Sequence, residues 1–167
     1  MLLLAVAAML GGGLGGAGGP IGPGGKIGTM TVVRGTSLQA DLKFFDLCDP
    51  VILKPGRYLR TCRVPRVRRL FIGYGDFEPT RKALERDWKQ KRWSLWVDGR
   101  PVNLPAFGTS DRTLVSFPAA GGKDVVLREW RVILVGATAG RHTLRYRSRT
   151  ASARTTDATW RFVVATN

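Results

Sequence analysis

Alternating apolar and basic residues in the C-terminal part of the chain constrain its fold more than any other feature. Between residues 141 and 149, Leu144 and Tyr146 fall on one side of an extended chain, and arginines occupy the positions between and after them. A period of two is that of a β-strand with one buried face. Residues 130–134 and 158–165 repeat this pattern. If these strands form a meander, they share an apolar face and an arginine face.

Turn signals separate further short strands along the chain. Asp98-Gly99 is the typical sequence of a type I′ hairpin turn, and Gly121-Gly122 marks another reversal. Many short strands with turns at fairly regular spacing predict an all-β sandwich. The strands we expect are residues 29–33, 38–45, 58–64, 67–72, 93–97, 100–104, 113–117, 124–135, 141–149 and 158–165.

One segment, residues 79–91, has the pattern of a helix. Pro79 suits the first helical position, and the residues that follow are strong helix formers. Leu84 and Trp88 are four residues apart and therefore share a face, whereas most other side chains are charged. We predict a surface helix that is inserted between strands and held by a narrow apolar stripe.

Two short motifs, residues 54–58 and 139–144, resemble corners of the immunoglobulin-like modules found in extracellular bacterial proteins. In each motif a glycine precedes an aromatic residue, Tyr58 or His142, that begins a strand. The resemblance implies an immunoglobulin-like antiparallel β-sandwich in which the polar tip of the aromatic residue bonds to nearby backbone. It implies no function, and the helix at residues 79–91 departs from the plain sandwich.

The first 25 residues contain no charged side chain. Residues 1–10 are almost wholly apolar and a glycine-rich run follows, which suits an export signal and is too short to span a bilayer. No basic residue precedes the apolar run, so an uncleaved anchor and a wrongly assigned start are alternatives. We expect an export signal or a glycine-rich tether over residues 1–25, followed by a single domain over residues 26–167 that is secreted or held in the cell envelope.

The two cysteines lie on either side of a turn signal. Cys48 and Cys62 are nearly symmetric about Pro55-Gly56, and a hairpin folded there would bring them opposite each other. In an oxidising compartment this spacing predicts a disulfide; the alternative is two unrelated buried thiols. The spacing excludes a redox or zinc site of the CxxC type.

Few residues are available for catalysis or metal binding. The chain has one histidine, His142, and two cysteines, so multi-histidine and multi-cysteine metal sites are excluded. His142 falls on the apolar face of its strand and no nucleophile motif accompanies it, so we predict a structural role with a satisfied hydrogen bond. The scattered carboxylates are expected in turns and ion pairs. We therefore predict no enzyme activity, no metal and no cofactor.

The charge balance points to anionic partners. Lys and Arg number 27 against 12 Asp and Glu, which gives a formal net charge of +15. We predict that Arg131, Arg145, Arg147 and Arg161 project from one side of one sheet and form an anion-binding surface. The expected ligands are acidic polysaccharide, a cell-wall polymer or an anionic membrane surface; nucleic acid is not favoured because its binding motifs are absent. The alternative is a compositional bias toward arginine without any ligand.

These observations predict an exported, non-catalytic binding or structural module. One alternative is an enzyme that acts on an extracellular polymer, which requires a pocket with at least two carboxylates. Another is a subunit of a larger envelope assembly that pairs through exposed strand edges. Trp96 and Tyr74 are the candidates for exposed aromatic rings, although the helix could cover Trp96.

Overall fold

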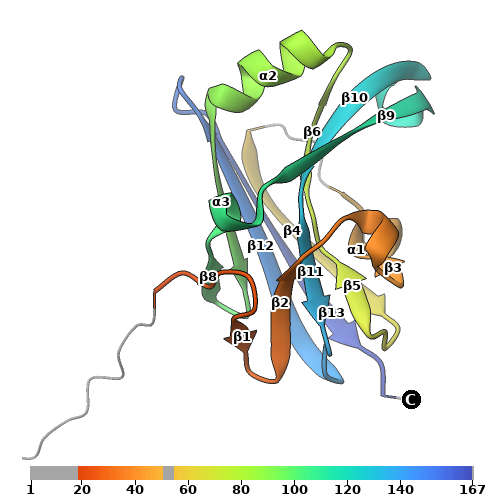
Figure 1. The fold of residues 1–167 in the computed structure, drawn as a ribbon, viewed down its shortest axis with the longest axis vertical. Helices are drawn as coiled ribbons and strands as arrows, with labels where there is room; N and C mark the ends of the chain where they lie inside the picture. Colours follow the sequence, from red (N-terminus) through yellow and green to blue (C-terminus); the bar gives the residue numbers. More distant parts are fainter. Residues whose placement is uncertain (1–18, 51–54, 167) are drawn as a thin grey trace, which may run out of the picture.

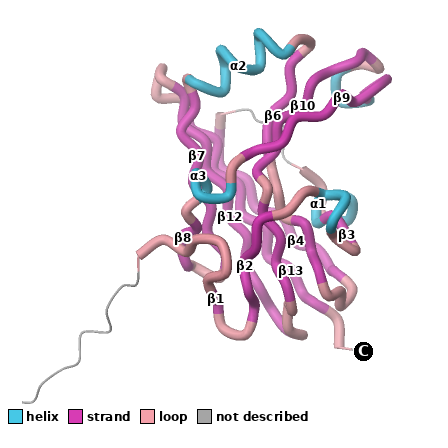
Figure 2. Tube along the Cα trace, viewed as in Figure 1, coloured by secondary structure: helices cyan, strands magenta, loops and turns pink. Residues whose placement is uncertain are grey.

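The computed structural model describes residues 19–50 and 55–166. Most of the predicted export signal, residues 1–18, lies outside this part of the chain. Strands make up 54% of the structure and helices 16%, which confirms the all-β prediction (Figures 1 and 2). Within the described residues, no helix is long and apolar enough to cross a membrane.

Three sheets build the fold, and the largest antiparallel ladder is in the sheet that we call sheet A. Its central strands, β12 and β13, pair over ten successive residue pairs, from Gly140 opposite Val164 to Arg149 opposite Thr155. Sheet A has the strand order β4 (Gly56–Val64), β13 (Thr155–Val164), β12 (Gly140–Thr150), β7 (Lys91–Val97) and β8 (Arg100–Val102).

Sheets B and C are joined by two segments of the chain, each of which passes from a strand of one sheet to a strand of the other after a short break. Sheet B packs against sheet A, and sheet C extends past the end of the two packed sheets as an arm (Figure 1). Sheet B has the order β1 (Lys26–Ile27), β2 (Met30–Arg34), β11 (Val132–Val135), β5 (Arg69–Phe71) and β3 (Leu42–Lys43); sheet C has the order β6 (Gly75–Glu78), β10 (Lys123–Trp130) and β9 (Thr109–Phe117).

The core lies between sheets A and B and is dominated by aromatic rings. Trp160 is fully buried, packs against Phe45 and Tyr74 with ring centroids 5.1 and 5.6 Å apart, and donates a hydrogen bond from Nε1 to the Asp49 carbonyl at 3.0 Å. The Tyr146 hydroxyl crosses between the sheets and donates to the Ile72 carbonyl at 3.1 Å. Trp93 is only partly buried against this core, whose buried members include Leu95, Trp130, Val132, Leu144, Tyr146, Trp160 and Phe162.

The predicted surface helix is confirmed as α2 (Arg81–Lys89), which connects β6 in the arm to β7 in sheet A (Figure 1). The Thr80 hydroxyl caps its start by accepting a hydrogen bond from the Ala83 N–H at 3.2 Å. Trp88 packs the helix against the sheets: its ring centroid lies 5.2 Å from that of Trp93 and 5.3 Å from that of Trp130. The remaining short helices are η1 (Ser37–Gln39), α1 (Phe44–Leu47), α3 (Leu104–Phe107) and η2 (Pro118–Ala120).

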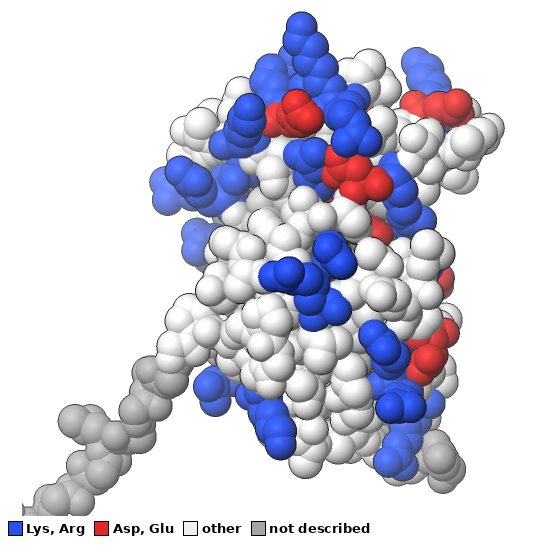
Figure 3. Space-filling view, viewed as in Figure 1, with Lys and Arg blue, Asp and Glu red and all other residues white. Residues whose placement is uncertain are grey.

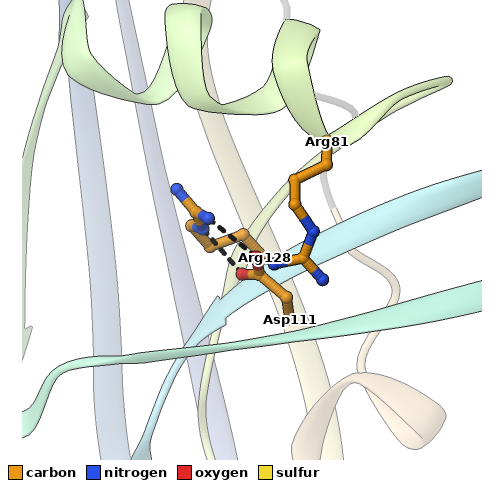
Figure 4. A network of polar contacts seen from close by, with 3 residues as sticks. All are labelled: Arg81, Asp111 and Arg128. Atoms are coloured by element: carbon orange, nitrogen blue, oxygen red, sulfur yellow. Dashed lines mark hydrogen bonds and ion pairs between the residues drawn. The ribbon is translucent and has the colours of Figure 1, made fainter.

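A salt bridge ties α2 to the arm. Asp111 on β9 accepts from Arg128 on β10 at 2.6 and 2.7 Å, and Arg81 at the start of α2 reaches the same carboxylate at 3.0 Å (Figure 4). Arg128 also lies over the Trp88 ring, 5.8 Å from its centroid. One carboxylate thus joins the helix to two strands of sheet C.

Two local predictions are wrong. Residues 38–45 do not form one strand: they comprise the end of η1, the two-residue strand β3 and the start of α1, because a helical turn there buries Phe44 against Trp160 and Phe162. The expected strands also include none over residues 75–78, where the structure has β6. A side chain at Gly75 would lie 1.7 Å from the Arg128 carbonyl, so glycine there permits the close pairing of β6 with β10.

The immunoglobulin-like resemblance implied a wholly antiparallel sandwich, but two strand pairs are parallel. β4 runs parallel to β13, and β3 runs parallel to β5. β4 leads directly into β5 of the facing sheet and pairs with the last strand of the chain, so no local turn determines its direction.

The predicted disulfide is confirmed, but the hairpin that predicted it is not. Cys48 and Cys62 are bonded, with Cα atoms 5.5 Å apart. Cys62 lies in β4, whereas Cys48 ends α1 and its N–H donates to the Phe44 carbonyl at 2.9 Å. The bond therefore links a helix to the edge strand of sheet A. Residues 51–54, next to the predicted Pro55-Gly56 turn, lie outside the described part of the chain.

Replacing Trp160 by Ala should lower the free energy of unfolding by about 3–5 kcal/mol, because the ring is fully buried among other aromatic rings. Urea unfolding measures this change. Trp96→Ala, at a half-buried tryptophan on the opposite face of sheet A, is the control and should cost clearly less. Equal losses would show that Trp160 is not a centre of the core; if Trp160→Ala does not fold, Trp160→Phe supplies the comparison.

Replacing both cysteines by Ala should lower the free energy of unfolding by about 3 kcal/mol, because the bond closes a loop between residues 14 positions apart. Urea unfolding of this double variant is compared with that of the parent protein under oxidising and reducing conditions. The parent should fall to the level of the variant when it is reduced, and the variant should not respond. A parent that is insensitive to reduction would contradict the role of this bond.

Candidate anion-binding face

The charged side chains on the surface of sheet A that points away from the core are mainly arginines. Because Leu144, Tyr146, Trp160 and Phe162 all point inward, the alternate positions of β12 and β13 must point outward. We call this surface the outer face. Its arginines are Arg57 and Arg63 on β4, Arg161 on β13, Arg141, Arg145, Arg147 and Arg149 on β12, and Arg92 on β7.

The four arginines predicted to form one surface do not stay together. Arg145, Arg147 and Arg161 lie on the outer face, but Arg131 does not. Arg131 sits between β10 and β11, at the point where the chain passes from sheet C to sheet B, and its buried Nε has no hydrogen-bond partner. The predicted strand 124–135 breaks there because its two halves pair with different strands, so its alternation carries no information about sheet A.

Arg145 is already bound within the protein. Its Nε and Nη2 donate to the two oxygens of Asp157 at 2.7 and 2.5 Å, and its guanidinium lies over the Trp96 ring, 5.0 Å from the centroid. Trp96 is therefore covered by Arg145 and not by the helix. The other predicted exposed ring, that of Tyr74, is buried in the core.

The second carboxylate near the outer face, Asp98, is also occupied. Its Oδ1 accepts from the Thr143 N–H at 2.7 Å, and its Oδ2 lies 2.8 Å from His142 Nδ1. His142 Nε2 lies 2.9 Å from the Thr138 carbonyl, so both ring nitrogens have an oxygen partner. This confirms the structural role predicted for His142. The I′ hairpin of Asp98 and Gly99, both with positive φ, presents this carboxylate.

Three arginines from three adjacent strands line one hollow on the outer face. Arg141 and Arg63 lie in one row across the sheet, both opposite Val163, so their Cα atoms are roughly 10 Å apart. Arg161 is two residues before Val163 and lies roughly 7–8 Å from each. The hollow has a volume of about 840 Å³, and Asp98, held by Thr143 and His142, also lines it. None of the three guanidinium groups has an ion pair or hydrogen bond with the described residues.

A second, adjoining hollow of about 590 Å³ runs along the same face. Arg57, Arg145, Asp157 and Arg161 line it, and Arg161 is common to both hollows. Since Arg145 and Asp157 neutralise each other, Arg57 on this side and the three arginines of the first hollow carry the unbalanced charge. Basic groups therefore flank a neutral centre on one continuous surface.

Basic residues elsewhere are more evenly balanced by acids. On the side of the molecule seen in Figure 3, Lys and Arg are densest near α2, with Asp and Glu among them. The ion pairs of that region include Arg81–Asp111, Arg86–Asp87, Arg128–Asp111 and Lys91–Asp76. On the outer face, the two described carboxylates, Asp98 and Asp157, are also bound by neighbouring groups. The outer face differs from the α2 region because most of its arginines have no ion pair with a described residue.

A pocket between α1 and sheet C bears on the enzyme alternative, since Asp46, Asp76 and Glu129 all line it. Gly75 pairs with Glu129 and Asp76 pairs with Arg128, so the two side chains Asp76 and Glu129 point to opposite faces of sheet C. The Asp76 carboxylate is held by Lys91 on the far side. These two carboxylates therefore do not form a pair, and the described residues contain no group of three or more metal-ligating side chains.

No family model, curated protein or solved structure matches this chain. The functional interpretation of the outer face therefore depends on the geometry of that face alone. The alternation predicted that Arg147 and Arg161 lie on one surface, but it did not predict that Arg63 and Arg141 lie beside them. The period of two marks both residues as outward, yet only the parallel pairing of β4 with β13 brings Arg63 beside Arg161.

The Arg145–Asp157 pair gives a pH-dependent prediction. The hydrogen bond from Arg145 holds the pKa of Asp157 below its ordinary value of 3.8. The pair therefore stabilises the fold above the unfolded-state pKa of Asp157, and this contribution is lost as the pH falls through the folded-state pKa. Arg145→Gln should raise the pKa of Asp157, as measured by NMR titration of its carboxyl carbon.

Arg149→Gln is the matched control, because Arg149 is an outward arginine of the same strand that has no contact with Asp157. It should leave the Asp157 titration nearly unchanged. An unchanged titration in Arg145→Gln would contradict the assignment of Arg145 as a bound, structural arginine.

Proposed function

We propose that the protein is an exported, non-catalytic module that binds an anionic polymer on the outer face of sheet A. The observation that carries this proposal is the hollow in which Arg63, Arg141 and Arg161 meet without a free carboxylate. Like charges on adjacent strands oppose one another, and bound anions would relieve this repulsion. A surface of this kind attracts polyanions through the release of their counterions.

The geometry suits a ligand with several separated anionic groups. Arginine forks bind carboxylate, sulfate or phosphate oxygens in pairs, and three of them can surround one group. Arg57 and Arg147 form a second basic group, since both lie opposite Asp157 in one row across the sheet, one on each side of it. A chain that spans both groups would be an acidic polysaccharide or a cell-wall phosphate polymer; an anionic membrane surface offers the same chemistry in a plane.

Export and the immunoglobulin-like fold are parts of this proposal. The Cys48–Cys62 disulfide supports export, because such bonds persist in oxidising compartments. The immunoglobulin-like assignment is supported by the His142 corner, with its bond to the Thr138 carbonyl, and by the Tyr58 hydroxyl, which lies 3.5 Å from the Pro55 carbonyl. The parallel strand pairs and the arm are additions to that pattern.

Changing Arg63, Arg141 and Arg161 to Gln together should weaken binding to a polyanion such as dextran sulfate and reduce the dependence of binding on salt. Each lost arginine–anion contact should lower the slope of log K against log salt by roughly 0.7–0.9. Fluorescence anisotropy at several salt concentrations measures both effects. The free energy of unfolding should change little, because the three side chains are exposed.

The matched control changes Lys82, Arg86 and Lys89 of α2 to Gln, which removes the same charge from another surface. This variant should bind nearly as tightly as the parent protein. Equal losses in the two triple variants would mean that net charge alone drives binding, and no loss in either would contradict the proposed face.

A further inference from the structure

The pocket between α1 and sheet C is independent of the outer face. It has a volume of about 290 Å³, near the lower end of the roughly 300–1,000 Å³ typical of small-molecule sites. One wall is the face of sheet C that points away from α2, and the other comes from α1 and the residues next to it. The apolar side chains that line it are Phe45, Phe71, Tyr74, Phe77, Leu114, Phe117 and Leu127.

Much of this apolar lining is not covered by the described residues. Phe71 and Tyr74 at the base are buried, but Phe45, Phe77 and Leu127 are only partly so. The rings of Phe77 and Phe117 pack edge to face, with centroids 5.0 Å apart, and so hold the outer part of the wall in place. The pocket is therefore preformed and has apolar surface to offer to a ligand.

Glu129 is the buried carboxylate on the pocket side of sheet C, and the charges of Arg112 and Lys43 lie near it. Glu129 is only 5% exposed and accepts from the Ser37 hydroxyl at 3.3 Å and from Arg112 Nη2 at 3.5 Å. Burial raises the pKa of Glu129, and the nearby positive charges of Arg112 and Lys43 oppose this rise. A buried carboxyl group of this kind inside an apolar pocket is typical of a binding site.

Lys43 and Arg112 are the cations that line the pocket, and one of its two buried carboxylates, Asp76, is already paired with Lys91. Lys43 has no ion pair with a described residue, and the Arg112 side chain is 41% exposed and touches Glu129 only at the limit of hydrogen bonding. Asp46, the third carboxylate of the lining, is exposed to water, which screens its charge. Lys43 and Arg112 together can thus hold one more negative charge beside Glu129.

We propose that this pocket binds a small amphiphile with a carboxylate head and a short apolar body. The body would lie against Phe45, Phe77 and Leu127, and the head would accept hydrogen bonds from Lys43 and Arg112. The volume limits the body to a short acyl chain or a single ring. The site is a second function of the chain and does not depend on polymer binding at the outer face.

Isothermal titration calorimetry with three probes of one chain length tests this assignment: octanoate, octanol and octyltrimethylammonium. Octanoate should bind most tightly, octanol more weakly through its apolar body alone, and octyltrimethylammonium least. The variant with Arg63, Arg141 and Arg161 changed to Gln should bind octanoate like the parent protein, which separates this pocket from the outer face. Binding of the ammonium probe that equals or exceeds that of octanoate would overturn the proposal, as would the absence of octanoate binding in the millimolar range.

Two substitutions locate the site. Leu127→Trp, which fills the pocket, should abolish binding of both octanoate and octanol. Lys43→Gln should weaken octanoate binding by about fivefold and leave octanol binding unchanged. Its matched control is Lys26→Gln, at an exposed lysine of β1 outside the pocket lining, which should change neither. Parent-like octanoate binding in Lys43→Gln would contradict the site, and this result decides the question even if Leu127→Trp does not fold.

Discussion

The packing of aromatic rings between sheets A and B is the interaction on which the rest of the structure depends. Trp160 has no exposed surface, contacts Phe45 and Tyr74, and places its indole N–H on the Asp49 carbonyl. A strand can turn only one of two successive side chains inward. Once Trp160 and Phe162 are in the core, Arg161 must point into solvent, and the ladder imposes the same choice on β12 and β4. The basic outer face is thus a consequence of how the core is packed.

The outer face then depends on how its few carboxylates are used. Asp157 binds Arg145, and Asp98 binds the Thr143 N–H and lies beside His142, so neither is available to the remaining arginines. These interactions stabilise the sheet near its centre and at the β7–β8 turn. Among the described residues they leave Arg63, Arg141 and Arg161 without an ion pair in one hollow, where three cations outnumber the single carboxylate of Asp98 and favour an external anion.

The arm creates the second site. At Arg131 the chain leaves the ladder of sheet C and enters that of sheet B, so the far part of β10 is no longer packed against sheet A. α2 covers one side of the arm through Trp88 and the Asp111 salt bridges. The other side faces α1 across a pocket, and Glu129 is the buried charged group within it. The two proposed sites therefore arise from different features: one from strand alternation, the other from a break in a strand.

The sequence by itself determined the properties that depend on near neighbours in the chain. The alternation in β12 and β13, the helix held by Leu84 and Trp88, and the hairpin at Asp98-Gly99 were all readable, because each is a local pattern with one physical period. The disulfide was predicted correctly, although Cys48 lies at the end of a helix and not on a strand paired with β4. Only the tertiary structure decided that Phe44 belongs to a helical turn, that β4 runs parallel to β13, and that Arg131 lies outside the outer face. These features follow from contacts between residues far apart in sequence, and a local period carries no information about which strand will become the neighbour.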